Sequence, residues 1–351
     1  ADDDYEVLVV GKTLGFRHSH IDDTTQAIID LGEDHGFTVD VWDPPNDSTG
    51  PFWGASPGQP ELTMESTPFT SAEDLSQYAT IIFVSPVDGT NNQDPEAPRL
   101  LDDAELAAFQ GYIRDGGGFV GIHAATDAMH AVPWWSELTG GGARFQSHPR
   151  QQEATMHVED PTHPSTEMLP LVWERFDEWY NYTANPRADV HVLITLDEET
   201  YNPGSGAMGE DHPIAWCQNF DGGRSWYEGA GHTDESYSDP LFLEHILGGI
   251  EWTAGVVDGG GNCVTFDEVE ELVDDLDTDT GRERAAVRNV TKHLDKAEQA
   301  ADADNHAKAA RELRTASVLA GALVRGEDGD VLSDKIADLA EWQRGLATSG
   351  R

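Results

Sequence analysis

Short apolar runs alternate with helical periodicity along the first part of the chain. Runs rich in apolar residues occupy 6–11, 37–42, 80–85 and 119–122, and runs of this length predict strands. Between the third and fourth runs, apolar residues recur at helical spacing over 103–114. Apolar strands that alternate with helices are typical of an α/β fold with a doubly wound, mostly parallel sheet.

Polar segments follow three of these predicted strands, at 17–20, 85–88 and 123–127. Ligands of doubly wound sheets bind beyond the carboxyl ends of the strands, so we expect the three segments to share one site. His123 stands between the apolar run and a predicted helix, and three glycines at 116–118 precede the run. A polar residue at the apex of a strand-to-helix turn is typical of a nucleophile elbow, although histidine is not a usual nucleophile.

The second half of the chain divides by composition. Trp, His and Gly are frequent over 133–255, and a glycine-rich linker follows at 256–263. From 264 to 351, apolar residues recur at helical spacing in a sequence rich in Ala, Leu, Glu, Asp and Arg, which predicts a small all-α helical bundle. We therefore predict an α/β domain at 1–255, the linker, and the bundle at 264–351.

The charge of the chain excludes two classes of partner. It carries 66 acidic and 21 basic residues, a net charge of −45. Nucleic acids and anionic membrane surfaces both require clustered cations, so neither is expected to bind. The acidic residues are scattered, which favours a hydrated surface suited to high salt, where counterions screen the self-repulsion. We predict a halophilic protein.

Cysteines and apolar runs add few constraints. Cys217 and Cys263 are the two cysteines of the chain, so a zinc ribbon is excluded, and they could pair in an oxidising compartment. No apolar run reaches the ~18 residues that span a bilayer, so no transmembrane segment is expected. The chain begins with Ala1 rather than Met, and we leave open a secreted or cell-surface location and a cytoplasmic one.

Several sequence blocks within 7–254 resemble the ThuA-like (trehalose utilization) family. The resemblance rests on GFRHSHI at 15–21, GGGFVGIHAATDA at 116–128, PWWSELTGGGARFQSHP at 133–149, VEDPTHPST at 158–166, DEWYNY at 177–182, HPIAWC at 212–217, GRSWYEGAGHTDESYSDP at 223–240 and HILGGIEWTAG at 245–255. It implies a fold similar to class I glutamine amidotransferases, which is flavodoxin-like, and a role in disaccharide or keto-sugar metabolism. The predicted bundle resembles the FIMAH type of helical module found on extracellular enzymes.

The amidotransferase relatives place a cysteine at the elbow to form a thioester. This chain has His123 at that position, and its cysteines lie elsewhere. Glutamine hydrolysis through a thioester is therefore excluded.

Two kinds of chemistry remain open at the predicted site. Histidines beside carboxylates can act as general acid and base near neutral pH, and neutral imidazoles with a carboxylate can hold one divalent metal ion. The candidates for catalysis are His123, Asp127, Glu178 and His232. The candidates for metal binding are His18, His123 and His148. Substrate contacts are expected from Arg17, His18, Trp134, Trp179, Tyr180, Arg224 and Glu235, because aromatic rings can stack on a sugar and an arginine can bind an anionic or carbonyl group.

Our first hypothesis for function is a lyase, isomerase or hydrolase that acts on a small carbohydrate by one of these two chemistries. A sugar-binding protein without catalysis is the second hypothesis. The third is an exported scaffold that is attached through its helical bundle. Self-association into a homo-oligomer is left open.

Overall fold

The computed structural model describes residues 5–45, 58–257, 263–276, 280–301, 303, 305–324 and 326–348. The chain divides into two compact units, the first made of Ala1–Val158 and Pro164–Asp258 and the second of Glu159–His163 and Gly259–Arg351. Most of the predicted linker, and residues 46–57 between the second and third predicted strands, lie outside the described residues.

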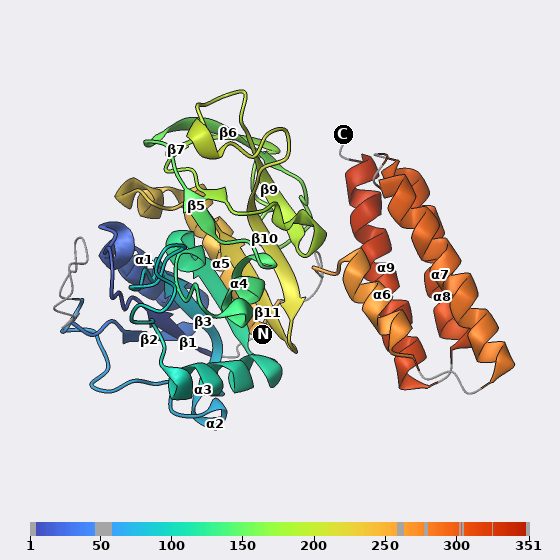
Figure 1. The fold of residues 1–351 in the computed structure, drawn as a ribbon, viewed down its shortest axis with the longest axis horizontal. Helices are drawn as coiled ribbons and strands as arrows, with labels where there is room; N and C mark the ends of the chain where they lie inside the picture. Colours follow the sequence, from blue (N-terminus) through green and yellow to red (C-terminus); the bar gives the residue numbers. More distant parts are fainter. Residues whose placement is uncertain are drawn as a thin grey trace. The chain divides into compact units, whose positions relative to one another are not determined.

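A twisted sheet runs through the first unit (Figure 1). Its described strands follow the order β2-β1-β3-β4-β11-β10-β9-β6-β7. The first five are parallel, and each later strand is antiparallel to the one before it. The strands are β1 (Tyr5–Val10), β2 (Phe37–Trp42), β3 (Tyr78–Val84), β4 (Gly118–Ile122), β6 (Gln152–Val158), β7 (Val172–Asp177), β9 (His191–Asp197), β10 (Pro213–Phe220) and β11 (Gly223–Glu228), while β5 (Phe145–Ser147) pairs separately with β8 (Asn181–Tyr182).

Helices cover both faces of the parallel half. On one face, α5 packs with Gly249 against Trp226 of β11 and with Thr253 against Thr80 of β3. On the other face, rings from α3 and α4 pack against Phe83 and Phe119 of the sheet. The helices of the first unit are α1 (His20–His35), α2 (Ala72–Leu75), α3 (Asp103–Arg114), α4 (Pro133–Gly140) and α5 (Pro240–Ala254), with short 3₁₀ turns η1 (His123–Thr126), η2 (Pro186–Ala188), η3 (Gly204–Gly206) and η4 (Asp234–Ser238).

The predicted fold class is confirmed, and local sequence signals account for several boundaries. The helix predicted at 103–114 forms as α3, because Asp102 and Glu105 cap its first turn reciprocally in a capping box. The strand predicted at 37–42 forms as β2. One local expectation was wrong: His123 begins the 3₁₀ turn η1, and the next α-helix, α4, begins only at Pro133.

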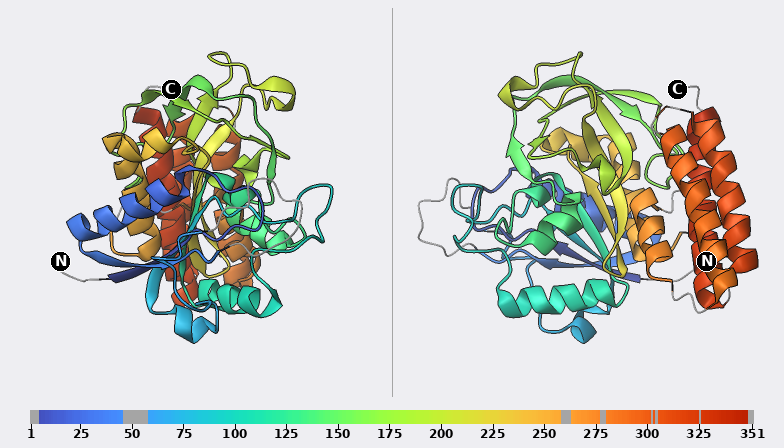
Figure 2. Two further views of the ribbon diagram at one scale, coloured as in Figure 1. Left: turned by 90° about the vertical axis from the view of Figure 1, so that its left-hand side faces the viewer. Right: turned by 45° about the vertical axis from the view of Figure 1, so that its right-hand side comes forward.

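The second unit is helical, as its sequence periodicity predicts. Its helices are α6 (Phe266–Asp274), α7 (Gly281–Ala301), α8 (His306–Leu323) and α9 (Glu327–Thr348). Figure 2 shows α7, α8 and α9 running side by side. Their shared core includes small residues on facing helices, among them Ala297, Ala316, Ala320 and Ala340, which let the helices approach closely. None of the described helices is long and apolar enough to cross a membrane.

Candidate metal site at the carboxyl edge of the sheet

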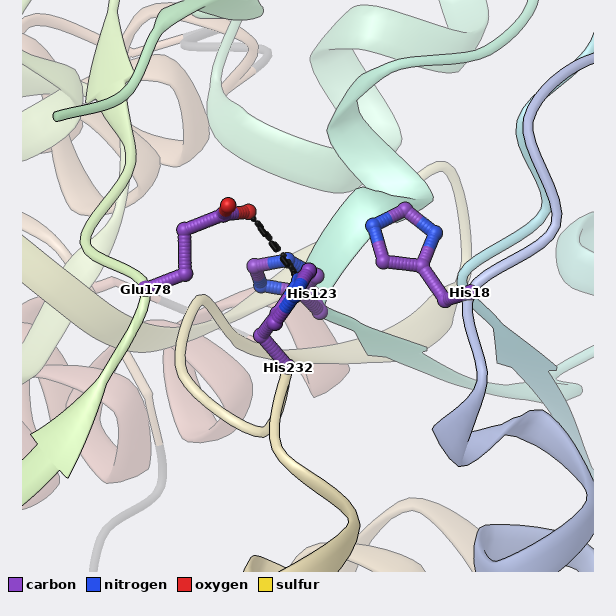
Figure 3. Close-up of side chains that lie close together, drawn as sticks. All are labelled: His18, His123, Glu178 and His232. Atoms are coloured by element: carbon purple, nitrogen blue, oxygen red, sulfur yellow. Dashed lines mark hydrogen bonds and ion pairs between the residues drawn. The ribbon is translucent and has the colours of Figure 1, made fainter. Parts of the chain in front are cut away.

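Four polar side chains meet beyond the carboxyl ends of the strands (Figure 3). His18 comes from the segment between β1 and α1, His123 follows β4 directly, and His232 follows β11. Glu178 comes directly after β7. The edge predicted from the sequence therefore carries a cluster of three imidazoles and one carboxylate, in which only His232 is more than slightly exposed.

The donor atoms of this cluster are unusually close. His123 Nε2 lies 3.2 Å from Glu178 Oε2 and 3.2 Å from His232 Nδ1. His232 Nδ1 lies 3.1 Å from the same Glu178 oxygen. A nitrogen of His18 completes a set in which all four donor atoms lie within 4.8 Å of one another.

The hydrogen bonding of His123 leaves its other nitrogen facing the cluster. His123 Nδ1 is 2.7 Å from the carbonyl oxygen of Gly229, an acceptor only, so this nitrogen carries a proton and donates it. A neutral His123 then directs a lone pair from Nε2 at Glu178 Oε2, which is also an acceptor. A proton on His232 Nδ1 can relieve only part of this repulsion, whereas a cation at the centre would satisfy every donor atom.

The spacing matches a coordination sphere. Zinc ligands lie at about 2.0–2.1 Å from the ion, and in tetrahedral geometry such ligands are about 3.4 Å apart. The three contacts of 3.1–3.2 Å are close to this value. Three imidazole nitrogens and one carboxylate oxygen are the donor types that suit zinc and related transition metals.

The ionisation of Glu178 and His18 also suits a cation. Burial alone would raise the pKa of Glu178, but its interactions with His123 and His232 lower it well below its usual range. Burial lowers the pKa of His18, and the neighbouring histidines lower it further. Burial also opposes protonation of His232, but Glu178 outweighs this effect and raises the pKa of that ring. Glu178 is thus an anion, and His18 is a neutral imidazole.

The backbone of His123 is strained and supported. Its φ is 49°, in the left-handed region that residues other than glycine and asparagine rarely adopt. The Tyr227 hydroxyl donates to the His123 carbonyl oxygen at 2.7 Å and holds this conformation. Gly229, whose carbonyl oxygen sets the tautomer, must be glycine because a Cβ there would lie 2.3 Å from the Tyr182 hydroxyl.

Asp177 ties the loop that carries His232 to the strand that carries Glu178. Its carboxylate accepts hydrogen bonds from the backbone N–H groups of Glu178, Gly231 and His232 at 2.8–2.9 Å. Its complete burial and its backbone partners make Asp177 a structural corner beside Glu178.

Two further residues named from the sequence adjoin the cluster. His148 Nδ1 lies 3.1 Å from Glu178 Oε1, the carboxylate oxygen that faces away from His123, so His148 orients Glu178 and lies outside the four-residue set. Asp127 accepts a hydrogen bond from His130 Nε2 at 2.9 Å. Burial raises the pKa of Asp127, while His130, His123 and His148 oppose the rise.

A buried hydrogen-bond chain, which the sequence did not reveal, lies behind the cluster. Ser85 Oγ accepts from the Ala124 N–H at 3.4 Å and lies 2.8 Å from His20 Nε2. The Thr24 hydroxyl donates to the His20 carbonyl oxygen and lies 2.8 Å from His20 Nδ1. Because both hydroxyl groups have defined partners, His20 donates from Nδ1 and accepts at Nε2, and it links α1 to the ends of β3 and β4.

Two of the three aromatic residues proposed for substrate contact, one buried and one partly buried, make other contacts. Trp179 is fully buried and donates to the Gln152 carbonyl oxygen. Trp134 donates to Asp221 beyond β10, and its ring packs on Phe109. Tyr180 is the exception, since its ring centroid lies 4.0 Å from that of His123, but it is buried and supports that ring from behind.

The charged residues proposed for substrate contact either bind other groups of the protein or lie away from the cluster. Arg17 is adjacent to His18 in sequence, but its guanidinium forms two hydrogen bonds with Asp43 at 2.6–2.7 Å. Arg224 lies at the beginning of β11, the opposite end from His232, and donates to the Trp252 carbonyl oxygen. Glu235 is exposed on η4 and lines a groove beside α1.

This fold and site define a doubly wound, amidotransferase-like α/β protein with histidine at the elbow. The chain belongs to the trehalose utilisation family, ThuA, which it matches over residues 6–253. Neither cysteine of the chain is a free thiol. No curated protein matches the chain.

Two solved structures share its fold. A ThuA-like protein from Bacteroides uniformis is 23% identical with a TM-score of 0.52, and the match covers 72% of this chain and 93% of that one. A ThuA-like protein from Parabacteroides merdae is 21% identical with a TM-score of 0.51, and the match covers 73% of this chain and 92% of that one. The family indicates a role related to carbohydrates.

Proposed function

We propose that the protein is a metal-dependent enzyme that acts on a small carbohydrate. His18, His123, Glu178 and His232 hold one divalent transition-metal ion, with zinc as the first candidate. The observation that carries this proposal is the contact of three donor atoms at 3.1–3.2 Å, of which His123 Nε2 and Glu178 Oε2 are both acceptors when His123 is neutral. Such an arrangement is costly without a cation to share.

The proposed chemistry uses the ion and one carboxyl group. A zinc ion held by these four side chains would have to accept a carbonyl oxygen or a water molecule as a fifth ligand, and polarising the one or activating the other would suit lyase, isomerase or hydrolase chemistry on a sugar. Asp127 is our candidate for moving the proton, because a partly buried carboxyl with a raised pKa can exchange a proton closer to neutral pH than a fully exposed one. His130 holds Asp127 in position through its Nε2 hydrogen bond.

Metal analysis of the purified protein tests the metal site. We expect one zinc ion per chain after reconstitution. Removing one donor in Glu178→Ala or His232→Ala should weaken zinc binding by more than about a hundredfold, since removing a residue that only supports a ligand already costs about 10–100-fold. His157→Ala is the matched control, because His157 is a partly exposed histidine on β6 that lies 3.5 Å from Asp197. Equal zinc affinity in all variants would refute the site.

A turnover assay tests whether the protein is an enzyme. Zinc-loaded protein should convert at least one member of a panel of neutral disaccharides and their keto derivatives, and Asp127→Asn should lower kcat about 100-fold or more with zinc content unchanged. Binding without turnover across the panel would favour a sugar-binding protein instead.

A further inference from the structure

One large aromatic side chain is exposed beside the cluster. Phe16 is 47% exposed, and its ring meets the edge of the His18 ring with centroids 4.9 Å apart. The other exposed phenylalanine among the described residues, Phe176, lies on β7 on the face opposite to Asp177. The tryptophans that we expected to contact a sugar do not occupy this place.

The backbone around Phe16 is fixed on both sides. The N–H groups of Leu14 and Gly15 both donate to the Val87 carbonyl oxygen, at 2.9 and 3.1 Å. Gly15 packs so tightly that a Cβ there would lie 2.5 Å from the Asp88 carbonyl oxygen. On the other side, the Arg17 guanidinium is held by Asp43. An exposed aromatic ring therefore stands on a rigid support, although exposure costs the free energy of hydrating its apolar surface.

We infer that Phe16 is the stacking platform for the apolar face of a pyranose ring whose reacting end reaches the His18–His123–Glu178–His232 cluster. The C–H groups on one face of a pyranose make an apolar surface that suits an aromatic ring, while its hydroxyl groups remain free for polar partners. The contact with His18 links this platform directly to a proposed metal ligand. This inference rests on the proposed function and names the substrate contact at the same site.

The charges around Phe16 favour a neutral sugar. Asp22 is exposed and accepts from Arg17, and Ser19 donates to Asp234 at 2.7 Å. Arg17, the neighbouring cation, already lies against two carboxylates, Asp22 and Asp43. A sugar phosphate or uronate would meet net negative charge on this side, whereas hydroxyl groups can donate to these carboxylates.

Saturation-transfer NMR on the zinc-loaded full-length protein tests the platform. The probes are trehalose, maltose, the methyl α- and β-glucosides, and glucose 6-phosphate as the anionic comparison. We expect the neutral probes to receive saturation mainly on the hydrogens of one ring face. Phe16→Ala should weaken their binding about fivefold to tenfold, the range expected for loss of one aromatic contact. Phe16→Tyr and Phe176→Ala should bind like the wild type, and all variants should keep one zinc ion per chain.

Three results would overturn the inference. The first is that Phe16→Ala binds the probes with unchanged affinity and the same saturated hydrogens. The second is that no neutral probe binds at all. The third is that glucose 6-phosphate binds more tightly than the neutral sugars. Each of these leaves the zinc content intact and is thereby distinguished from failure of the proposed metal site, which would appear as loss of stoichiometric zinc in the wild type.

Discussion

At the scale of single residues, the proposed metal site depends on two acceptor atoms that face one another, His123 Nε2 and Glu178 Oε2. Gly229 fixes the proton of His123 on Nδ1, and this single hydrogen bond directs Nε2 at Glu178. The carbonyl oxygen therefore acts as the partner that commonly orients a metal-binding histidine. The identity of residue 229 matters too, since a Cβ there would lie 2.3 Å from the Tyr182 hydroxyl and 2.9 Å from the Ile214 carbonyl oxygen.

His148 should modulate metal affinity rather than determine it. It contacts Glu178 through Oε1, while Glu178 Oε2 faces the cluster. We predict that His148→Ala weakens zinc binding about 10–100-fold, less than Glu178→Ala does. Competition titrations with a chromogenic chelator measure both variants. A His148→Ala loss as large as that of Glu178→Ala would show instead that His148 is itself a ligand.

Asp177 should be required for both stability and metal binding. In Asp177→Asn, the amide N–H group would face backbone N–H groups that now donate to a carboxylate. We expect the free energy of unfolding to fall by about 2–3 kcal/mol and zinc affinity to fall about tenfold or more. Urea unfolding and zinc titration measure these changes. Asp197→Asn, a partly exposed position on β9, is the control, and a similar effect in both variants would contradict the account.

The sequence predicted the positions of site residues that follow strands better than the positions of those that lie within strands or helices. His18, His123, Glu178 and His232 were all named, because each follows an apolar run or lies in a polar block. Arg224 was placed at the site by its block, but it lies at the other end of β11 from His232. The roles of Trp134 and Trp179 depend on packing, which a linear pattern does not encode.

At the scale of elements, the sheet itself brings Glu178 to the site. Four strands separate β4 from β7 in the sheet, yet Glu178 directly after β7 contacts His123 directly after β4. The twist of the sheet and the hydrogen bonds that Asp177 accepts from the loop after β11 bring the two strand ends together. The sequence predicted the parallel half from its apolar runs, but the curvature of the antiparallel half had no local signal.

An ion pair between η2 and the segment before β10 predicts a specific pH dependence. Arg187 contacts both Asp211 oxygens at 2.6–2.7 Å. Burial alone would raise the pKa of Asp211, but Arg187 and Asn185 outweigh it and lower the pKa. A carboxyl with a lowered folded pKa stabilises the protein above its unfolded pKa of about 3.9, and this contribution is lost as the pH falls through the folded value.

Asp211→Asn tests this pH dependence, because a protonated Asp211 resembles asparagine. The variant should be less stable than the wild type by up to about 1 kcal/mol at pH 6, a modest value because the pair is partly exposed. The difference should shrink as the pH falls below about 4. Urea midpoints at constant high salt measure it, and a difference that grows with acidity would show that the sign is wrong.

At the scale of the whole molecule, the net charge of −45 should make stability depend on salt. The Debye length falls from about 10 Å at 0.1 M to about 3 Å at 1 M, which removes most repulsion between surface carboxylates. We expect the Tm to rise by about 10 °C between 0.1 and 2 M KCl, equivalent to roughly 3 kcal/mol for a unit of this size. Thermal unfolding followed by circular dichroism measures the change. Sorbitol at equal osmolality should have a smaller effect, and an equal effect would exclude charge screening as the cause.

X-ray absorption at the zinc edge of the reconstituted full-length protein tests the central claim most directly. The account predicts one zinc ion with nitrogen and oxygen ligands at about 2.0–2.1 Å, outer-shell scattering from imidazole rings, and no sulfur at about 2.3 Å. A reduction of the imidazole scattering by about a third in His232→Ala, from three rings to two, and unchanged scattering in His157→Ala would assign the site. A spectrum without imidazole scattering, or a protein that retains no stoichiometric metal, would contradict the account.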